Sequence, residues 1–144
     1  ARGFETFFLS EARTDDERRV AEMENASIQY EQSARVVGSN DLDLIRNSLR
    51  NEFYIMASNS LAGLVQDELA AFHNGPNRGV KQAGFWVLVD AFMPAVLIEL
   101  AFLSNPGEER MLGSGSFQVE AARGIANAVD RFFESHQDWT GATP

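Results

Sequence analysis

One short apolar run restricts the possible folds of this chain more than any other feature. Residues Ala95–Ala101, within MPAVLIELAFLSN, are apolar except for Glu99, and they lie between Pro94 and a Ser-Asn-Pro turn. A run of this length predicts a strand buried on both faces, as in parallel sheets that carry helices on each side. Carboxylates are almost never fully buried unless they are paired, so Glu99 needs a partner charge, a metal-bound water or the open end of the strand. The alternative is a carboxylate satisfied by a nearby arginine or by backbone N–H groups.

Further strands and helices are predicted around this run. Strands are expected over residues 4–9 (FETFFL) and 80–89; the second is either a strand throughout or a strand after a short turn, and Gly84 weakens it. Helices are expected over 14–26, 41–72, a short stretch from 106, and 116–135. Strands that alternate with helices predict an α/β fold, in which ligands collect beyond the carboxyl ends of the strands, near Glu99.

The predicted helices carry start signals and apolar faces. Thr14 precedes three acids and is an expected N-cap; Asn105 is another, with Pro106 at the first helical position and Glu108 three residues after the cap. The side chains expected on the inner faces are Val20, Met23 and Ser27; Leu42, Ile45, Leu49, Phe53, Met56, Ala57, Leu61, Leu64, Val65, Leu69 and Phe72; and Phe117, Ala121, Ile125, Ala128 or Val129, and Phe132.

Composition excludes several classes of protein. The 144 residues, 44% of them hydrophobic, suffice for one compact domain, and a flexible tail is predicted over 137–144. A net charge of -9 without a basic cluster argues against nucleic acid as a partner. No apolar run has transmembrane length, and the N-terminal residues lack the charged-then-apolar order of a signal peptide. The absence of cysteine excludes disulfides and thiolate metal sites and leaves the compartment open.

Four ordered motifs carry a family resemblance. The segments RGFETFFLS, NRGVKQAGFWVL, MPAVLIELAFLSN and FQVEAARGIANAVDRF, with AEMENASI between the first two, resemble the zinc-dependent N-acetylmuramoyl-L-alanine amidases that cut bacterial peptidoglycan. The resemblance covers residues 2 to about 133 and implies that residues 1–136 are the C-terminal part of an amidase catalytic domain. It implies a twisted, mostly parallel sheet flanked by helices, with Glu99 as the catalytic glutamate.

The implied reaction explains why an acid is needed. In this family zinc polarises the amide carbonyl and lowers the pKa of bound water towards about 7. Glu99 would take the proton of that water as general base and return it to the leaving nitrogen. By resemblance, the bond cut joins N-acetylmuramic acid to the L-alanine of the stem peptide, in the periplasm or outside the cell, and a regulatory activator protein is a possible partner.

The family's zinc ligands, two histidines and a glutamate, lie in segments that precede the strand matching FETFFL. We therefore expect no metal site in this chain. The N-terminal strands and the zinc ligands are expected to come from an N-terminal part of the same domain. The chain alone is then expected to be inactive. The strand over 4–9 would then have an unpaired edge. The alternative function is a non-catalytic fragment or degenerate relative that binds peptidoglycan or a partner.

Other polar residues have two interpretations. His73 and His136 belong to no metal-ligand motif and are expected to be solvated surface residues. Glu17, Glu22, Glu24 and Glu31 are expected on a solvated helix face. The alternative for Glu31 is an inhibitory zinc ligand, because some members of the family are held inactive by a helix whose glutamate occupies the zinc.

Two further motifs of the resemblance contain polar residues. Arg78, Lys81 and Gln82 match a family motif near the active-site side. For Arg78 the alternatives are capping carbonyls or pairing an acid, and contacting stem-peptide carboxylates. Asn25 is expected to tie down backbone at a helix end.

Overall fold

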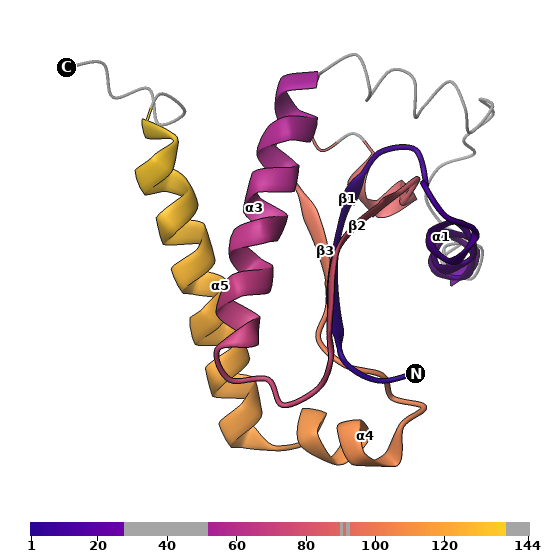
Figure 1. Ribbon diagram of the computed structural model, residues 1–144, viewed down its shortest axis with the longest axis vertical. Helices are drawn as coiled ribbons and strands as arrows, with labels where there is room; N and C mark the ends of the chain where they lie inside the picture. Colours follow the sequence, from indigo (N-terminus) through magenta and orange to yellow (C-terminus); the bar gives the residue numbers. More distant parts are fainter. Residues whose placement is uncertain (28–51, 90, 92, 138–144) are drawn as a thin grey trace. The chain divides into compact units, whose positions relative to one another are not determined.

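The computed structural model describes residues 1–27, 52–89, 91 and 93–137. Their elements are β1 (Phe4–Leu9), α1 (Asp15–Ser27), α3 (Glu52–Ala70), β2 (Asn77–Ala83), the 3-10 helix η2 (Trp86–Leu88), β3 (Val96–Glu99), α4 (Pro106–Leu112) and α5 (Gly115–Ser135) (Figure 1). The α/β class is thus confirmed. The predicted helix residues 41–51 and the predicted tail residues 138–144 lie outside the described residues. In the described segments, no helix combines the length and apolarity needed to cross a membrane.

The three strands form a sheet in the order β2-β1-β3. β1 and β2 are parallel, since the Phe4 N–H donates to the Pro76 carbonyl and the Ser10 N–H to the Ala83 carbonyl. β3 runs the other way, so the sheet is mixed rather than mostly parallel. In the described residues of the link from β2 to β3, the structure has one 3-10 turn and no crossover helix, which a parallel return would need.

Two expectations about the strand edges are wrong. β1 is the central strand of this sheet and all six of its residues are buried, so it has neighbours on both sides. β3 is an edge strand, and its four residues are half-buried rather than buried on both faces.

The chain divides into two compact units. The first comprises Ala1–Thr6, Ser60–Val80 and Ile98–Pro144, and the second comprises Phe7–Asn59 and Lys81–Leu97.

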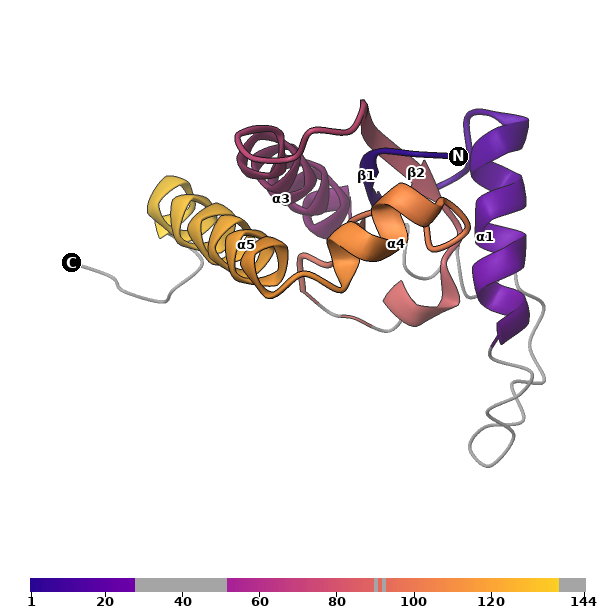
Figure 2. The ribbon, with the colours of Figure 1, turned by 90° about the horizontal axis from the view of Figure 1, so that it is seen from below.

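In the first unit, the second half of α3 packs against α5, and the two helices run side by side in both views (Figures 1 and 2). Gly124 makes the close approach possible, because a Cβ there would be 3.2 Å from the Phe72 ring. Glu68 of α3 accepts hydrogen bonds from Arg131 at 2.6 Å and Asn127 at 3.2 Å. These bonds, chiefly the one from Arg131, lower the pKa of Glu68. The expected inner face of α5 is confirmed, with Phe117, Ala121, Ala128 and Phe132 buried.

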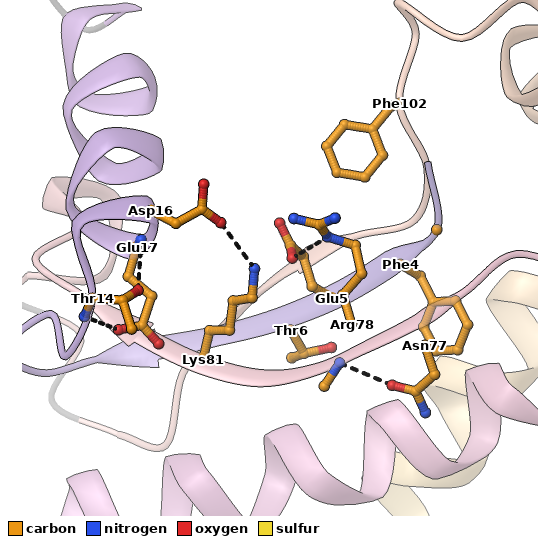
Figure 3. Close-up of polar contacts among 12 residues, drawn as sticks. Phe4, Glu5, Thr6, Thr14, Asp16, Glu17, Asn77, Arg78, Lys81 and Phe102 are labelled. Carbon is orange, nitrogen blue, oxygen red and sulfur yellow. Dashed lines mark hydrogen bonds and ion pairs between the residues drawn. The ribbon is translucent and has the colours of Figure 1, made fainter. Parts of the chain in front are cut away.

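The core of the second unit contains the buried residues Phe7, Leu9, Ala21, Ala83, Phe85 and Leu88. Thr14 caps α1 as expected: its Oγ1 accepts from the Glu17 N–H at 3.2 Å. Glu17 completes the capping box by accepting from the Thr14 N–H at 3.0 Å (Figure 3). Glu17 is therefore buried, contrary to the expected solvated face, whereas Glu22 and Glu24 are exposed as expected.

Two predicted apolar faces are wrong in part. On α1 the buried side chains are Glu17 and Ala21, while Met23 is exposed. On α3 the stripe Ala57, Leu61, Val65 and Leu69 is buried as expected, but Phe53 and Met56 are exposed. A periodic pattern gives the spacing of a helix face; burial depends on what packs against it.

The predicted strand over 80–89 is wrong at both ends, since β2 begins at Asn77 and stops at Ala83. The cause lies in Asn25, which confirms its expected role of tying down backbone. Its Nδ2 donates to the Gly84 carbonyl at 2.8 Å, and its Oδ1 accepts from the Trp86 N–H at 2.9 Å. These side-chain bonds satisfy backbone groups that would otherwise continue the strand, and η2 follows.

Candidate functional site

Glu99 is the last residue of β3 and is half-buried. An acid in this apolar run needed a partner charge, a metal-bound water or a place at the end of the strand. The position of Glu99 matches the last of these. The chain then leaves the sheet through Leu100, Ala101 and Phe102 towards the cap of α4. The residues around this segment belong to the first unit.

The backbone directly after Glu99 is held by two side chains. His73 Nε2 lies 2.9 Å from the Leu100 carbonyl oxygen. Glu108 Oε2 accepts from the Phe102 N–H at 2.8 Å, and its Oε1 accepts from the Gly3 N–H at 2.6 Å. Since β3 ends at Glu99, these bonds replace the strand ladder in fixing the chain.

Glu108 differs from its expected capping role. Asn105 caps α4 as predicted, its Oδ1 accepting from the Gly107 and Glu108 N–H groups at 3.0 and 3.3 Å. The Glu108 side chain, however, does not return to the Asn105 N–H; it is buried and binds Gly3 and Phe102. Sequence spacing identified the cap but not this long-range contact.

His73 is buried, so its expected surface position is wrong. Its ring lies with centroids 4.6 Å from Phe4 and 5.6 Å from Phe117, and its Nδ1 accepts from the Gly75 N–H at 2.8 Å. The missed signal is the position of the histidine directly after the apolar stripe of α3. His136 is only half-buried at the end of α5, where it stacks on Phe132.

Arg78 pairs with an acid, as one of its two alternatives predicted. Its Nε donates to Glu5 Oε2 at 2.7 Å, and its guanidinium lies 5.3 Å from the centroid of the Phe102 ring (Figure 3). The Glu5 side chain is only 1% exposed. Glu5 is not among the residues predicted from the sequence, although a carboxylate inside an apolar strand is the same signal that singled out Glu99.

The other two residues of the Arg78 motif make contacts in the second unit. Lys81 Nζ lies 3.6 Å from Asp16 Oδ2 and 5.7 Å from the centroid of the Phe7 ring. Gln82 Nε2 donates to the Glu11 carbonyl at 2.6 Å, and its backbone N–H donates to Glu17 Oε1 at 3.4 Å. Both residues therefore have a structural role in this unit.

The described residues do not fit a zinc site. They contain no group of three or more His, Asp or Glu side chains that could hold a metal ion. Glu31, the alternative inhibitory ligand, lies outside the described residues.

Comparison with known proteins identifies the fold and the family. The family model Amidase_3, N-acetylmuramoyl-L-alanine amidase, matches residues 1–131. The amidase AmiC of Neisseria meningitidis is 36% identical over 98 residues, which are 68% of this chain and 24% of that protein. AmiA of Escherichia coli is 34% identical over 91 residues, 63% of this chain and 28% of that protein.

Solved structures give the same architecture. The catalytic domain of CwlV, an amidase from Bacillus (Paenibacillus) polymyxa, superposes with a TM-score of 0.58 at 22% identity, covering 93% of this chain and 50% of that chain. An amidase from Clostridium difficile superposes with a TM-score of 0.57 at 21% identity, covering 94% and 50%. This chain thus spans about half of the two solved structures and about a quarter of the two relatives named above.

Proposed function

Because the chain belongs to the N-acetylmuramoyl-L-alanine amidase family, we propose that it serves the hydrolysis of the amide between N-acetylmuramic acid and the L-alanine of the stem peptide, with Glu99 as general base. The observation that carries the proposal is the family match over residues 1–131, which includes Glu99 and the segment that holds it. The substrate of the family is peptidoglycan. The cell wall, in the periplasm or outside the cell, is therefore the proposed location.

Three features of Glu99 suit a general base. It is half-buried, which leaves access for a water molecule, and it ends a strand of a rigid sheet. The backbone after it is fixed by His73 and Glu108. A base held in this way takes a proton from the attacking water and returns it to the leaving nitrogen without a large change of position.

Zinc is included in the proposal only because the family consists of zinc-dependent amidases. The described residues do not form a zinc site; a zinc ion held elsewhere in the protein would polarise the scissile carbonyl and activate the water from which Glu99 takes the proton. We propose that the zinc ligands lie in protein segments outside these 144 residues. A regulatory activator protein stays a prediction.

The test is Glu99→Gln in the protein as its gene encodes it, with release of stem peptides from purified peptidoglycan as the assay. Gln keeps size and hydrogen bonding but cannot accept the proton, so turnover is expected to fall by roughly 100-fold or more. Bound zinc should be unchanged. Glu109→Gln is the matched control, because Glu109 is an exposed acid of α4.

Two outcomes would contradict the proposal. Full activity in Glu99→Gln would return Glu99 to a structural role. Binding of peptidoglycan by the wild type without hydrolysis would support the non-catalytic alternative.

A further inference from the structure

The ring of His73 joins two backbone segments, and both of its nitrogens are used. The Gly75 N–H donates to Nδ1 at 2.8 Å, so Nδ1 carries no proton. In a neutral imidazole the proton then sits on Nε2, which donates to the Leu100 carbonyl at 2.9 Å. The two contacts together assign the Nε2-protonated tautomer. In an imidazolium, Nδ1 would also carry a proton, and that N–H would face the Gly75 N–H.

The surroundings fix the orientation of this ring. His73 is buried, with Phe4 and Phe117 as aromatic neighbours. Gly75 leaves space for the ring, because a Cβ at that position would lie 2.6 Å from His73 Cε1. A side chain held by packing and by two hydrogen bonds is a rigid support rather than a mobile group.

The carbonyl that His73 binds belongs to the residue after Glu99. The strand ladder stops at Glu99, so Leu100 depends on a side chain for its hydrogen bond. Two residues further on, Glu108 holds the Phe102 N–H. The backbone that leaves Glu99 is thereby attached at two points, to His73 from 27 residues away and to Glu108, which also binds Gly3.

We propose that His73 is a positioning residue of the amidase site: in its Nε2-protonated form it holds the Leu100 carbonyl and thereby fixes the Glu99 carboxylate for proton transfer. This inference rests on the proposed function of Glu99. A general base displaced by about 1 Å loses on the order of 100-fold in rate. Loss of this support should therefore lower kcat while leaving substrate binding nearly intact.

Two substitutions separate the hydrogen bonds of the ring. His73→Asn keeps an acceptor near the position of Nδ1 but is too short to reach Leu100, whereas His73→Gln places an amide donor near the position of Nε2. Both remove the aromatic ring, so loss of packing is matched between them. We expect kcat to fall roughly 10- to 100-fold in His73→Asn with KM within about twofold, and Gln to restore most of it.

Two controls show whether the effect passes through Glu99. His136→Asn removes the other histidine, which also stacks on an aromatic ring, and should leave kcat unchanged. In the Glu99→Gln background, His73→Asn should cause little further loss, because the group it positions is already inactive.

A measurement independent of activity separates this inference from the proposed function. Long-range ¹H–¹⁵N correlation spectra should show the Nε2-protonated tautomer of His73, and hydrogen exchange over residues 99–103 should be faster in His73→Asn than in His73→Gln. If the tautomer and the exchange difference are both observed but the wild type does not hydrolyse peptidoglycan, the proposed function alone is contradicted. Equal kcat in the Asn and Gln variants of an active enzyme, or the opposite tautomer, would overturn the positioning role.

Discussion

Replacement of Gly3 by alanine tests the contacts that hold the start of β1. Gly3 has φ +103°, and a Cβ there would lie 2.1 Å from the Pro76 carbonyl oxygen. That oxygen accepts the Phe4 N–H at 3.1 Å, while the Gly3 N–H donates to the buried Glu108 carboxylate at 2.6 Å. An alanine cannot be accommodated unless the backbone of residue 3 or 76 moves.

The expected cost follows from two terms. A left-handed backbone at a residue with a Cβ costs about 1–2 kcal/mol. Moving the Pro76 carbonyl away leaves the N–H of buried Phe4 without its acceptor, which costs about 1–3 kcal/mol. Gly3→Ala should therefore lower the free energy of unfolding by about 2–5 kcal/mol, a large share of the roughly 5–15 kcal/mol typical of a domain.

Urea unfolding followed by circular dichroism measures this loss, as a lower midpoint at an unchanged slope. Gly63→Ala is the matched control. It lies inside α3 with nothing within 4 Å of the added Cβ, so helix propensity alone should stabilise the protein by up to about 1 kcal/mol. A Gly3→Ala variant as stable as the wild type would refute the contact geometry around Pro76.

Two further predictions concern ion pairs. Arg78→Met should destabilise the fold by about 3 kcal/mol, because it removes the guanidinium partner of the buried Glu5 carboxylate; adding Glu5→Gln should recover part of that loss in the same unfolding assay. Arg131→Met should cost at most about 1 kcal/mol at pH 7, since the pair is partly exposed. Arg131 lowers the pKa of Glu68 below its ordinary 4.5, so this contribution is present above pH 4.5 and is lost as the pH falls through the folded-state value. A stability difference between wild type and Arg131→Met that stays constant down to pH 2 would contradict this assignment.

Local sequence signals predicted the elements that depend on local physics. The periodic apolar spacing located α5, and Asn105 followed by Pro106 located the start of α4. The T-x-x-E pattern at Thr14 also specifies a complete capping box, which shows that Glu17 has bonds to make at the helix start. These features are set within a few residues, so the sequence carries them directly.

Long-range partners were beyond such signals. His73 was expected at the surface, yet its ring contacts residues more than 25 positions away in both directions, among them Phe4 and Leu100. The end of β2 depends on Asn25, which is 59 residues before Gly84. The direction of β3 relative to β1 depends on the path of the segment that connects β2 to β3. Each of these outcomes is decided by which distant groups meet, and spacing along the chain does not contain that information.

The buried acids of this protein distinguish Glu99 from its alternatives as general base. Glu17 and Glu108 each accept backbone N–H groups on both carboxylate oxygens, and Glu5 accepts a hydrogen bond from the Arg78 guanidinium. These three acids therefore hold the chain together. Glu99 differs in its place, half-buried at a strand end where the following backbone is fixed by other side chains.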